Sequence, residues 1–454
     1  MEAGKEKRFQ ILLMILIVVV VGILIALVVK SGAIPGLSKT VDKDKAEVIQ
    51  NEKQENTISG TIYSDDGVVI AKSAPKKYGG ATQKIYEERS YSSNVYTTML
   101  AKAGAGLEIQ YRDKLYDGEV EHKMSDGEIF YCGTDLYLTV NDTLQKKISR
   151  DIDGYPEASV VVMDDDGQIK AFVSSNEMSM DILNQNIASF HNGELINNNL
   201  ESSACGSVLK PIVAELLLEN GKNPQITDKG YIEIDGATIR NAGGVAYGKI
   251  DLEDALIYSS NQYFIQAALS LGALQIEEGF EQFGIGSSLK TGFCEVDSYA
   301  RAPKSDYALA NYVMGQDVLI SPLQLVQVMQ GIVTGEMAEP YIVKAVSKDG
   351  NKEQCDVKKE KKTVYIDDQA RNKVCKMLKK CAASYGLNEV DDSVMAKTGT
   401  AENGDGSQNA LLMASWKSDK RYYAVVRVRN TEMYGKDLAG IMKKTITATN
   451  NMKK

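Results

Sequence analysis

The stretch "ACGSVLKP", residues 204–211, places a serine hydroxyl and a lysine amine three positions apart, Ser207 and Lys210, at the predicted start of a helix. Residues three apart on a helix share one face, so the Lys210 amine can lie beside the Ser207 hydroxyl. One interpretation is a helix cap followed by a solvated lysine. The other is a nucleophile with its base, because serine attacks only after a base removes its proton.

A lysine can be that base when burial or a neighbouring cation destabilises its ammonium form. The start of a helix also offers free backbone N–H groups and the positive end of the helix dipole, which suit an oxyanion. The pattern Ser-x-x-Lys is nevertheless a weak signal in a chain of 454 residues. The choice between a helix cap and a nucleophile with its base therefore depends on the other motifs in the sequence.

A second motif, "SSN", comprises Ser259, Ser260 and Asn261 and lies between two apolar, helix-like runs. Ser259 and Asn261 flank one residue, so both side chains can point into one cleft at a turn. Read alone, this motif is a helix cap.

A third motif, "KTGT", runs from Lys397 to Thr400 on a predicted strand. On a strand, Lys397 and Gly399 share one face, and Thr398 and Thr400 share the other. Gly399 lacks a side chain, which would let a substrate approach the backbone closely. Read alone, this motif is a surface turn, but the ordered set of three motifs favours a catalytic site.

The composition excludes several classes of function. The net charge is −9 and no basic cluster occurs in the body of the chain, which argues against a nucleic-acid partner. The two histidines, His122 and His191, and the cysteines show no metal-ligand spacing. We therefore expect neither a bound metal nor another cofactor.

The six cysteines are predicted to be free thiols. Cys375 and Cys381 lie six positions apart in a helix-like stretch, so they point to different faces and should not pair. The others are Cys132, Cys205, Cys294 and Cys355.

The N-terminal part contains an uncharged apolar run at residues 11–29, long enough to span a bilayer, with basic residues before it. The run predicts a cytoplasmic tail and uncleaved anchor at 1–30, in a single-pass protein of the cell membrane whose C-terminal body is extracytoplasmic. The polar segment 31–57 is predicted to be a stalk.

The body of the chain has an α+β pattern. Short alternating segments predict a small α+β module at 58–150. In the following domain, 151–454, a hairpin at 158–174 comes first, helical periodicity fills 205–335, and strands return near the C-terminus before a final helix. Strands at both ends predict one sheet that is built from both ends of this domain and covered by helices.

The three motifs, in this order, resemble the signature of the penicillin-binding proteins, the serine D,D-transpeptidases of the cell wall. The stretches "AYGKIDLEDALIYSSNQYF" (246–264) and "GQDVLISPLQLVQVMQGIV" (315–333) are also similar to the family. The resemblance extends from about residue 59 to the last helix. It implies a pedestal, or dimerisation-like, module before a transpeptidase domain whose antiparallel sheet has helices on both faces.

The resemblance also implies catalytic roles. Ser207 would attack the carbonyl between the two terminal D-alanines of a peptidoglycan stem peptide, and Lys210 would take its proton. Ser259 would relay that proton to the leaving D-alanine. Asn261 would fix Lys210 and hold the donor peptide.

The substrate-binding roles are implied in the same way. Lys397, Thr398, Gly399 and Thr400 would form the binding strand, where the lysine charge and the threonine hydroxyls receive the carboxylate of the donor. The backbone N–H groups of Ser207 and Thr400 would form the oxyanion hole.

The resemblance is to the class B, monofunctional type, because the module at 58–150 is too short for a glycosyltransferase domain. It implies three partners: nascent stem peptides derived from lipid II, β-lactam antibiotics and a membrane glycan polymerase of the SEDS type. The alternatives are a D,D-carboxypeptidase, a β-lactamase or β-lactam sensor, whose class D types usually have valine at position 261, and a scaffold without cross-linking activity.

The sequence departs from the family at several positions. Cys205 replaces a proline before the Gly-Ser pair, and Ser59 replaces an arginine in the pedestal. On the strand after "KTGTAE", an aromatic pair of the family is reduced to Trp416, and we expect this reduction to alter substrate shape preference.

Overall fold

The structure is a computed structural model that describes residues 56–77, 85–100, 106–175, 197–348, 351–354 and 361–452. The predicted anchor at 1–30 and all but the last two residues of the predicted stalk lie outside the described residues. Within these ranges, no helix combines the length and apolar character needed to cross a bilayer.

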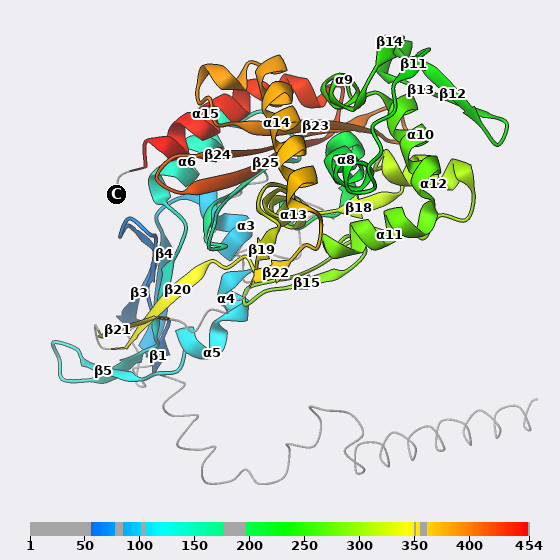
Figure 1. Cartoon of the computed structure of the whole chain (residues 1–454). Helices are drawn as coiled ribbons and strands as arrows, with labels where there is room; N and C mark the ends of the chain where they lie inside the picture. The colour runs from blue at the N-terminus through cyan, green and yellow to red at the C-terminus, as the bar shows by residue number, and fades with distance from the viewer. Residues whose placement is uncertain are drawn as a thin grey trace, which may run out of the picture.

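The central sheet is antiparallel and has the strand order β23-β24-β25-β8-β9. The hairpin β8–β9 therefore lies beside the three C-terminal strands, as predicted, so both ends of the domain build one sheet (Figure 1). The strands are β8 (Ala158–Asp164), β9 (Ile169–Ser174), β23 (Met395–Glu402), β24 (Gln408–Lys417) and β25 (Arg421–Thr431).

Helices cover both faces of this sheet, which confirms the predicted layering. Along β8, Val160 and Val162 pack into one hydrophobic core, and Val161 and Met163 pack into the other, since successive strand residues point to opposite faces. The first core contains α6 (Asp142–Asp151) and α15 (Ala439–Asn450), and the second contains α13 (Pro322–Thr334) (Figure 1).

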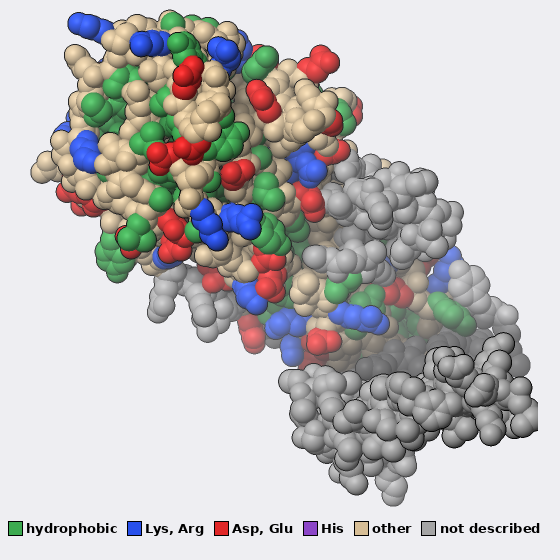
Figure 2. Space-filling model, turned by 90° about the vertical axis from the view of Figure 1, so that its right-hand side faces the viewer, with side chains coloured by type: hydrophobic (Ala, Val, Ile, Leu, Met, Phe, Trp, Pro, Cys, Tyr) green, Lys and Arg blue, Asp and Glu red, His purple; other side chains and the backbone are tan. Residues whose placement is uncertain are grey.

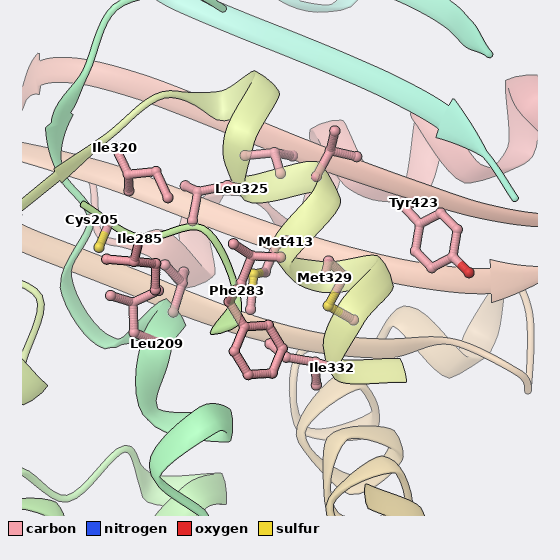
Figure 3. Packing of buried hydrophobic residues seen from close by; sticks show 14 of the residues in the cluster. Cys205, Leu209, Phe283, Ile285, Ile320, Leu325, Met329, Ile332, Met413 and Tyr423 are labelled. Carbon is pink, nitrogen blue, oxygen red and sulfur yellow. The ribbon is translucent and has the colours of Figure 1, made fainter. Parts of the chain in front are cut away.

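Figure 3 shows part of the second core, where side chains of α13 meet those of the central sheet and of neighbouring segments. Met329 and Ile332 of α13 lie near Met413 of β24 and Phe283, and Leu325 of the same helix lies toward Ile320. Cys205 and Leu209, on either side of the predicted nucleophile, also belong to this core. The core thus anchors the segment that carries Ser207.

The N-terminal module is built around a six-stranded sheet of order β21-β20-β7-β2-β3-β4 and a three-stranded sheet of order β1-β6-β5. Its strands are β1 (Thr57–Ile58), β2 (Ile62–Tyr63), β3 (Val69–Lys77), β4 (Ile85–Tyr91), β5 (Val120–Lys123), β6 (Ile129–Cys132), β7 (Asp135–Leu138), β20 (Val343–Lys348) and β21 (Asn351–Gln354). Its helices are η1 (Asn94–Tyr96), α3 (Thr97–Leu100), α4 (Leu107–Gln110) and α5 (Arg112–Leu115).

This module differs from the contiguous unit expected at 58–150. Strands β20 and β21 come from the segment assigned to the second domain, and β20 pairs with β7 in the register Val346↔Leu136. Helix α6, expected in the first module, packs against the central sheet instead. Pairing between strands about 200 residues apart (346 − 136 = 210) leaves no local signal in the sequence.

In the N-terminal module, the guanidinium near Gly60 comes from Arg89, because the neighbouring residue Ser59 has none. Its Nη1 donates to the Gly60 carbonyl at 3.1 Å, and its Nε pairs with Glu108 at 2.5 Å. Both partners of this ion pair are buried, and breaking such a pair by removing one partner is strongly destabilising.

The remaining helices and strands belong to the segments that connect or follow the strands of the central sheet. The helices are η3 (Gly206–Leu209), α8 (Lys210–Glu219), η4 (Ala242–Gly244), α9 (Leu252–Tyr258), α10 (Asn261–Leu271), α11 (Ala273–Gln282), α12 (Asp306–Val313), α14 (Asp368–Ser384), η5 (Leu387–Glu389) and η6 (Gly435–Leu438). The strands are β10 (Ser203–Ala204), β11 (Ile226–Asp228), β12 (Tyr231–Ile234), β13 (Ala237–Arg240), β14 (Gly248–Ile250), β15 (Ser288–Lys290), β16 (Glu295–Asp297), β17 (Tyr299–Ala300), β18 (Val318–Ile320), β19 (Glu336–Ala338) and β22 (Lys361–Thr363).

The cysteines and the surface agree with the sequence analysis where they are described. The five cysteines in the described residues are free, so Cys375 and Cys381 do not pair, and Cys355 lies outside those residues. On the face shown in Figure 2, acidic and basic side chains are interspersed, and no extended basic patch is visible on the coloured surface.

Candidate active site

Ser207 lies in the 3₁₀ turn η3, directly before α8. The N–H groups of Cys205 and Gly206 both donate to the Gly315 carbonyl, at 3.1 and 3.0 Å. Gly206 has φ +61°, and a Cβ atom there would lie 2.6 Å from the Thr400 carbonyl oxygen. Glycine at 206 therefore lets the turn approach β23, while the half-buried Ser207 side chain stays accessible.

Gly399 has a different function in the structure from the one expected. A Cβ atom at 399 would lie 2.4 Å from the Cys205 carbonyl oxygen and 2.8 Å from Cγ1 of Val208. The space beside Gly399 is thus filled by the turn that carries Ser207, not left open for a substrate. The close contact between this turn and β23 requires glycine on both sides.

Lys210, the first residue of α8, joins the first and second motifs. Its Nζ donates to the Ser259 carbonyl at 2.7 Å, to Asn261 Oδ1 at 2.7 Å and to Ser259 Oγ at 3.3 Å. The side chain is 0 % exposed. Burial, and then the charge of Lys397, lower the pKa of Lys210 well below its usual value, while the Asp228 charge opposes this shift. A lysine with a lowered pKa can accept a proton near neutral pH.

Lys397, in the third motif, also contacts Ser259. Its Nζ donates to Ser259 Oγ at 3.0 Å and to the Thr398 carbonyl at 3.0 Å. Burial lowers the pKa of Lys397 to about 8, so its ammonium form prevails at neutral pH. The Ser259 hydroxyl therefore lies between two lysine amines and keeps its own proton to donate.

The turn of the second motif is held in an uncommon conformation. Ser259 follows α9 and has φ 59°, in the left-handed region, which non-glycine residues occupy mainly where the surroundings hold them there. Ser260 points away from the lysines, caps α10 through Tyr263 N–H, and donates to buried Asp228 at 2.5 Å. The turn therefore presents Ser259 and Asn261, but not Ser260, to Lys210.

Two residues that the sequence analysis missed support this turn. Asn241 accepts the N–H groups of Asn261 and Gln262 through Oδ1, at 2.8 and 3.2 Å, and its Nδ2 donates to both Asp228 oxygens. Both Asn241 and Asp228 are buried. They occupy a strand and a loop without a recognisable motif, so only their position in the fold reveals them.

The threonines lie on the opposite side of β23 from the lysine, as the strand pattern predicted. Thr398 Oγ1 donates to the Tyr385 hydroxyl at 3.1 Å, and Thr400 Oγ1 accepts the Gly435 N–H at 3.0 Å. Both threonine side chains are half-buried and remain reachable. Binding of a carboxylate by their hydroxyls stays a prediction, and Thr398 would have to exchange its tyrosine partner to do so.

The predicted oxyanion donors, the backbone N–H groups of Ser207 and Thr400, belong to neighbouring segments, and their role stays a prediction. β23 is the edge strand of the central sheet, and its Thr400 backbone lies against Gly206, the residue before Ser207. The described hydrogen bonds include none between Ser207 and Lys210, which bonds to the second motif instead. Such catalytic contacts commonly tighten only when substrate is bound.

Two departures from the family do not affect the reacting groups. Cys205 is buried, and burial raises the pKa of its thiol to about 12, so it is neutral and serves packing. Trp416 is 0 % exposed, lies in the core with α15, and donates to Asn450 at 3.0 Å. The Trp416 ring therefore packs in the core and does not line the site. The expectation that the reduced aromatic pair alters substrate shape preference stays a prediction.

A serine beside a buried lysine, with a second serine between two amines, is an arrangement suited to serine acyl transfer. Comparison with known proteins supports this assignment to serine acyl transfer. Residues 158–448 match the family model of the penicillin-binding protein transpeptidase domain. The chain therefore belongs to this family, and the resemblance to the class B penicillin-binding proteins inferred from the motifs is confirmed.

Individual relatives show how far the similarity extends. The chain is 27 % identical to penicillin-binding protein 3 of Bacillus subtilis over 381 residues, 73 % of this chain and 54 % of the relative. It is 26 % identical to the peptidoglycan D,D-transpeptidase MrdA of Haemophilus influenzae over 244 residues, 47 % and 37 % of the two chains. The chain thus spans about half the length, or less, of these curated relatives.

Among solved structures, the penicillin G acyl-enzyme complex of penicillin-binding protein A from M. tuberculosis has the same fold. The two share 22 % sequence identity with a TM-score of 0.76, over 87 % of this chain and 99 % of the other. This similarity supports the mixed α/β fold described above.

Proposed function

We propose that this protein is a serine D,D-transpeptidase that cross-links peptidoglycan stem peptides and is acylated by β-lactams. The observation that carries the proposal is the convergence of three motifs on one hydroxyl: Ser259 Oγ lies 3.3 Å from Lys210 Nζ and 3.0 Å from Lys397 Nζ, beside the turn that bears Ser207.

Acylation begins with the uncharged Lys210 amine taking the Ser207 proton. Ser207 Oγ attacks the carbonyl between the two terminal D-alanines, and the N–H groups of Ser207 and Thr400 stabilise the oxyanion. Ser259 passes the proton to the departing amine of D-alanine. Lys397, in its ammonium form, holds the carboxylate of the donor and disfavours protonation of Lys210.

Deacylation repeats these proton transfers in reverse. The amine of a neighbouring stem peptide attacks the ester carbonyl, the bond to Ser207 Oγ breaks, and an amide forms. The proton that leaves the amine returns to Ser207 Oγ through Ser259 and Lys210. Asn261 supports both steps, since its Oδ1 accepts from Lys210 and its Nδ2 donates to the Arg240 carbonyl at 2.8 Å.

The test is incubation with a donor peptide ending in D-alanyl-D-alanine and a peptide amine as acceptor. We expect free D-alanine and a new cross-linked amide, both suppressed by penicillin. Free D-alanine without the amide would favour the D,D-carboxypeptidase alternative. Penicillin binding without either product would favour the sensor or scaffold alternative. The presence of Asn261, rather than valine, already argues against the sensor.

We also propose that residues 1–30 anchor the protein in the cell membrane, with 31–57 as a stalk, the pedestal module next and the transpeptidase domain outside the cytoplasm. The uncharged run at 11–29 supports this layout. In intact cells, an external protease should remove the domain and spare an N-terminal tag. Protection of the domain from that protease would contradict the layout.

A membrane glycan polymerase of the SEDS type is the proposed partner, because the class B resemblance implies an enzyme that cross-links strands made by another protein. The polymerase should co-purify with the full chain from detergent extracts. It should be absent when residues 1–30 are replaced by an unrelated membrane span, if the contact lies in the membrane.

A further inference from the structure

A cavity of about 570 Å³ opens beside the strands that lead to Ser207. Its lining includes Arg301 and Lys304, which follow β17, Gln316 and Asp317, which precede β18, and Leu319 of β18. Helix α12 contributes Ala308. The cavity thus lies between segments that the three motifs do not include.

The cationic side chains of this cavity have no ionic partner in the described part of the chain. Arg301 and Lys304 are exposed and make none of the ion pairs or side-chain hydrogen bonds found there, and the same holds for Asp317. Two cations and one carboxylate leave the lining with a net positive charge. Arginine and lysine in a concave site are suited to bind a carboxylate.

The wall of the cavity is connected directly to the nucleophile. Leu319 pairs with Ala204, and Ser207 follows three residues later, at most about 10 Å along the chain. Gly315, the residue before Gln316, packs against Gly206: a Cβ atom at 315 would lie 2.3 Å from the Gly206 carbonyl oxygen. Leu319 thus links one wall of the cavity to the segment that bears Ser207.

The donor peptide is expected to bind elsewhere around the same turn. Lys397, Ser259 and the edge of β23 surround the side on which Gly206 meets Thr400. The cavity lies instead beside β18 and Gln316, the residue after Gly315, which packs against Gly206. Two substrates that meet at one ester need two separate approaches, and this second approach carries unpaired positive charge.

We propose that this cavity is the binding site for the acceptor, and that Arg301 and Lys304 bind a carboxylate of the amine-bearing peptide. The inference rests on the proposed transpeptidase function. Binding the carboxylate would hold the acceptor so that its free amine nitrogen faces the carbonyl of the Ser207 ester. The nitrogen forms the amide bond, the ester C–O bond breaks, and the amine proton passes to Ser207 Oγ, so the step needs no further reactant.

The experiment compares two acceptors that differ in the carboxylate alone, D-norleucine and D-norleucinamide, at equal concentrations of free amine. The full-length protein in detergent is acylated by a donor ending in D-alanyl-D-alanine, and the ratio of transfer product to hydrolysis product is measured. Arg301→Ser/Lys304→Ser is the test variant. Lys373→Ser/Lys376→Ser, which removes two exposed cations from α14, is the matched control.

We expect the unaltered protein to prefer D-norleucine, and the test variant to lower its transfer-to-hydrolysis ratio about tenfold, as loss of charge-assisted hydrogen bonds implies. The ratio for the amide, and both ratios in the control variant, should stay unchanged. Penicillin acylation of the test variant shows that it is folded.

Equal use of both acceptors by the unaltered protein would overturn the proposal, as would an unchanged ratio in the test variant. A slower acylation with an unchanged ratio would assign the cavity to the donor and also overturn it. Absence of acylation in the unaltered protein would refute the proposed function and, with it, this inference.

Discussion

Replacement of Ser207 by alanine is expected to abolish covalent labelling by penicillin. The hydroxyl is the atom that would form the acyl bond, and neither buried lysine can replace it in forming a stable ester. Fluorescent penicillin should label the unaltered protein and give no band with Ser207→Ala. Mass spectrometry of the labelled protein should place the adduct on the peptide that contains Ser207.

The matched control is Ser202→Ala, which removes another half-buried serine on the same segment, whose hydroxyl bonds to the Asp297 carbonyl. This variant should label normally. Equal thermal unfolding of both variants would show that Ser207→Ala is folded. An adduct on any other residue, or none with any β-lactam, would refute the assignment of the nucleophile.

The two lysines are expected to respond differently to the same substitution. Lys210→Arg keeps the positive charge but provides no usable base, so penicillin acylation should fall by about 10²–10⁴-fold, the usual contribution of a general base. Lys397→Arg keeps the charge that the carboxylate needs, so acylation should remain measurable, weakened by the bulkier guanidinium. The measurement is the second-order rate constant of acylation for both variants, with thermal unfolding as the control for folding.

The pH dependence should distinguish the two lysines further. Acylation needs uncharged Lys210, so its rate should rise with pH through the lowered pKa of Lys210. It also needs charged Lys397, so the rate should fall above the pKa of Lys397, about 8. In Lys397→Arg the guanidinium stays charged, and the fall near pH 8 should disappear.

Two results would contradict the roles assigned to the lysines. If Lys210→Arg acylates as fast as Lys397→Arg, Lys210 is not the base, and Ser259 or a water would have to take the proton. If the fall near pH 8 persists in Lys397→Arg, a group other than Lys397 causes it. Because the two amines share Ser259, the measured pKa values describe the coupled pair.

Much of this protein could be predicted from its sequence because the signals are local. The three motifs are short, and their order in the sequence is enough to predict that Ser207, Lys210, Ser259 and Lys397 belong to one site. Alternation along the strands also predicted that Lys397 and Thr398 point to opposite sides of β23, which their partners Ser259 and Tyr385 confirm.

Only the tertiary structure decided what surrounds those motifs. Gly399 is glycine because the Cys205 carbonyl fills the space beside it, and Trp416 is directed into the core with α15. Asn241 supports the second motif from a separate loop, and β20 pairs with β7, which lies about 200 residues earlier in the chain. The sequence determined which groups could react, since propensity, pattern and motif act over a few residues. Contacts between distant segments depend on how the whole chain packs, so the lowered pKa of the buried Lys210 emerged only with the fold.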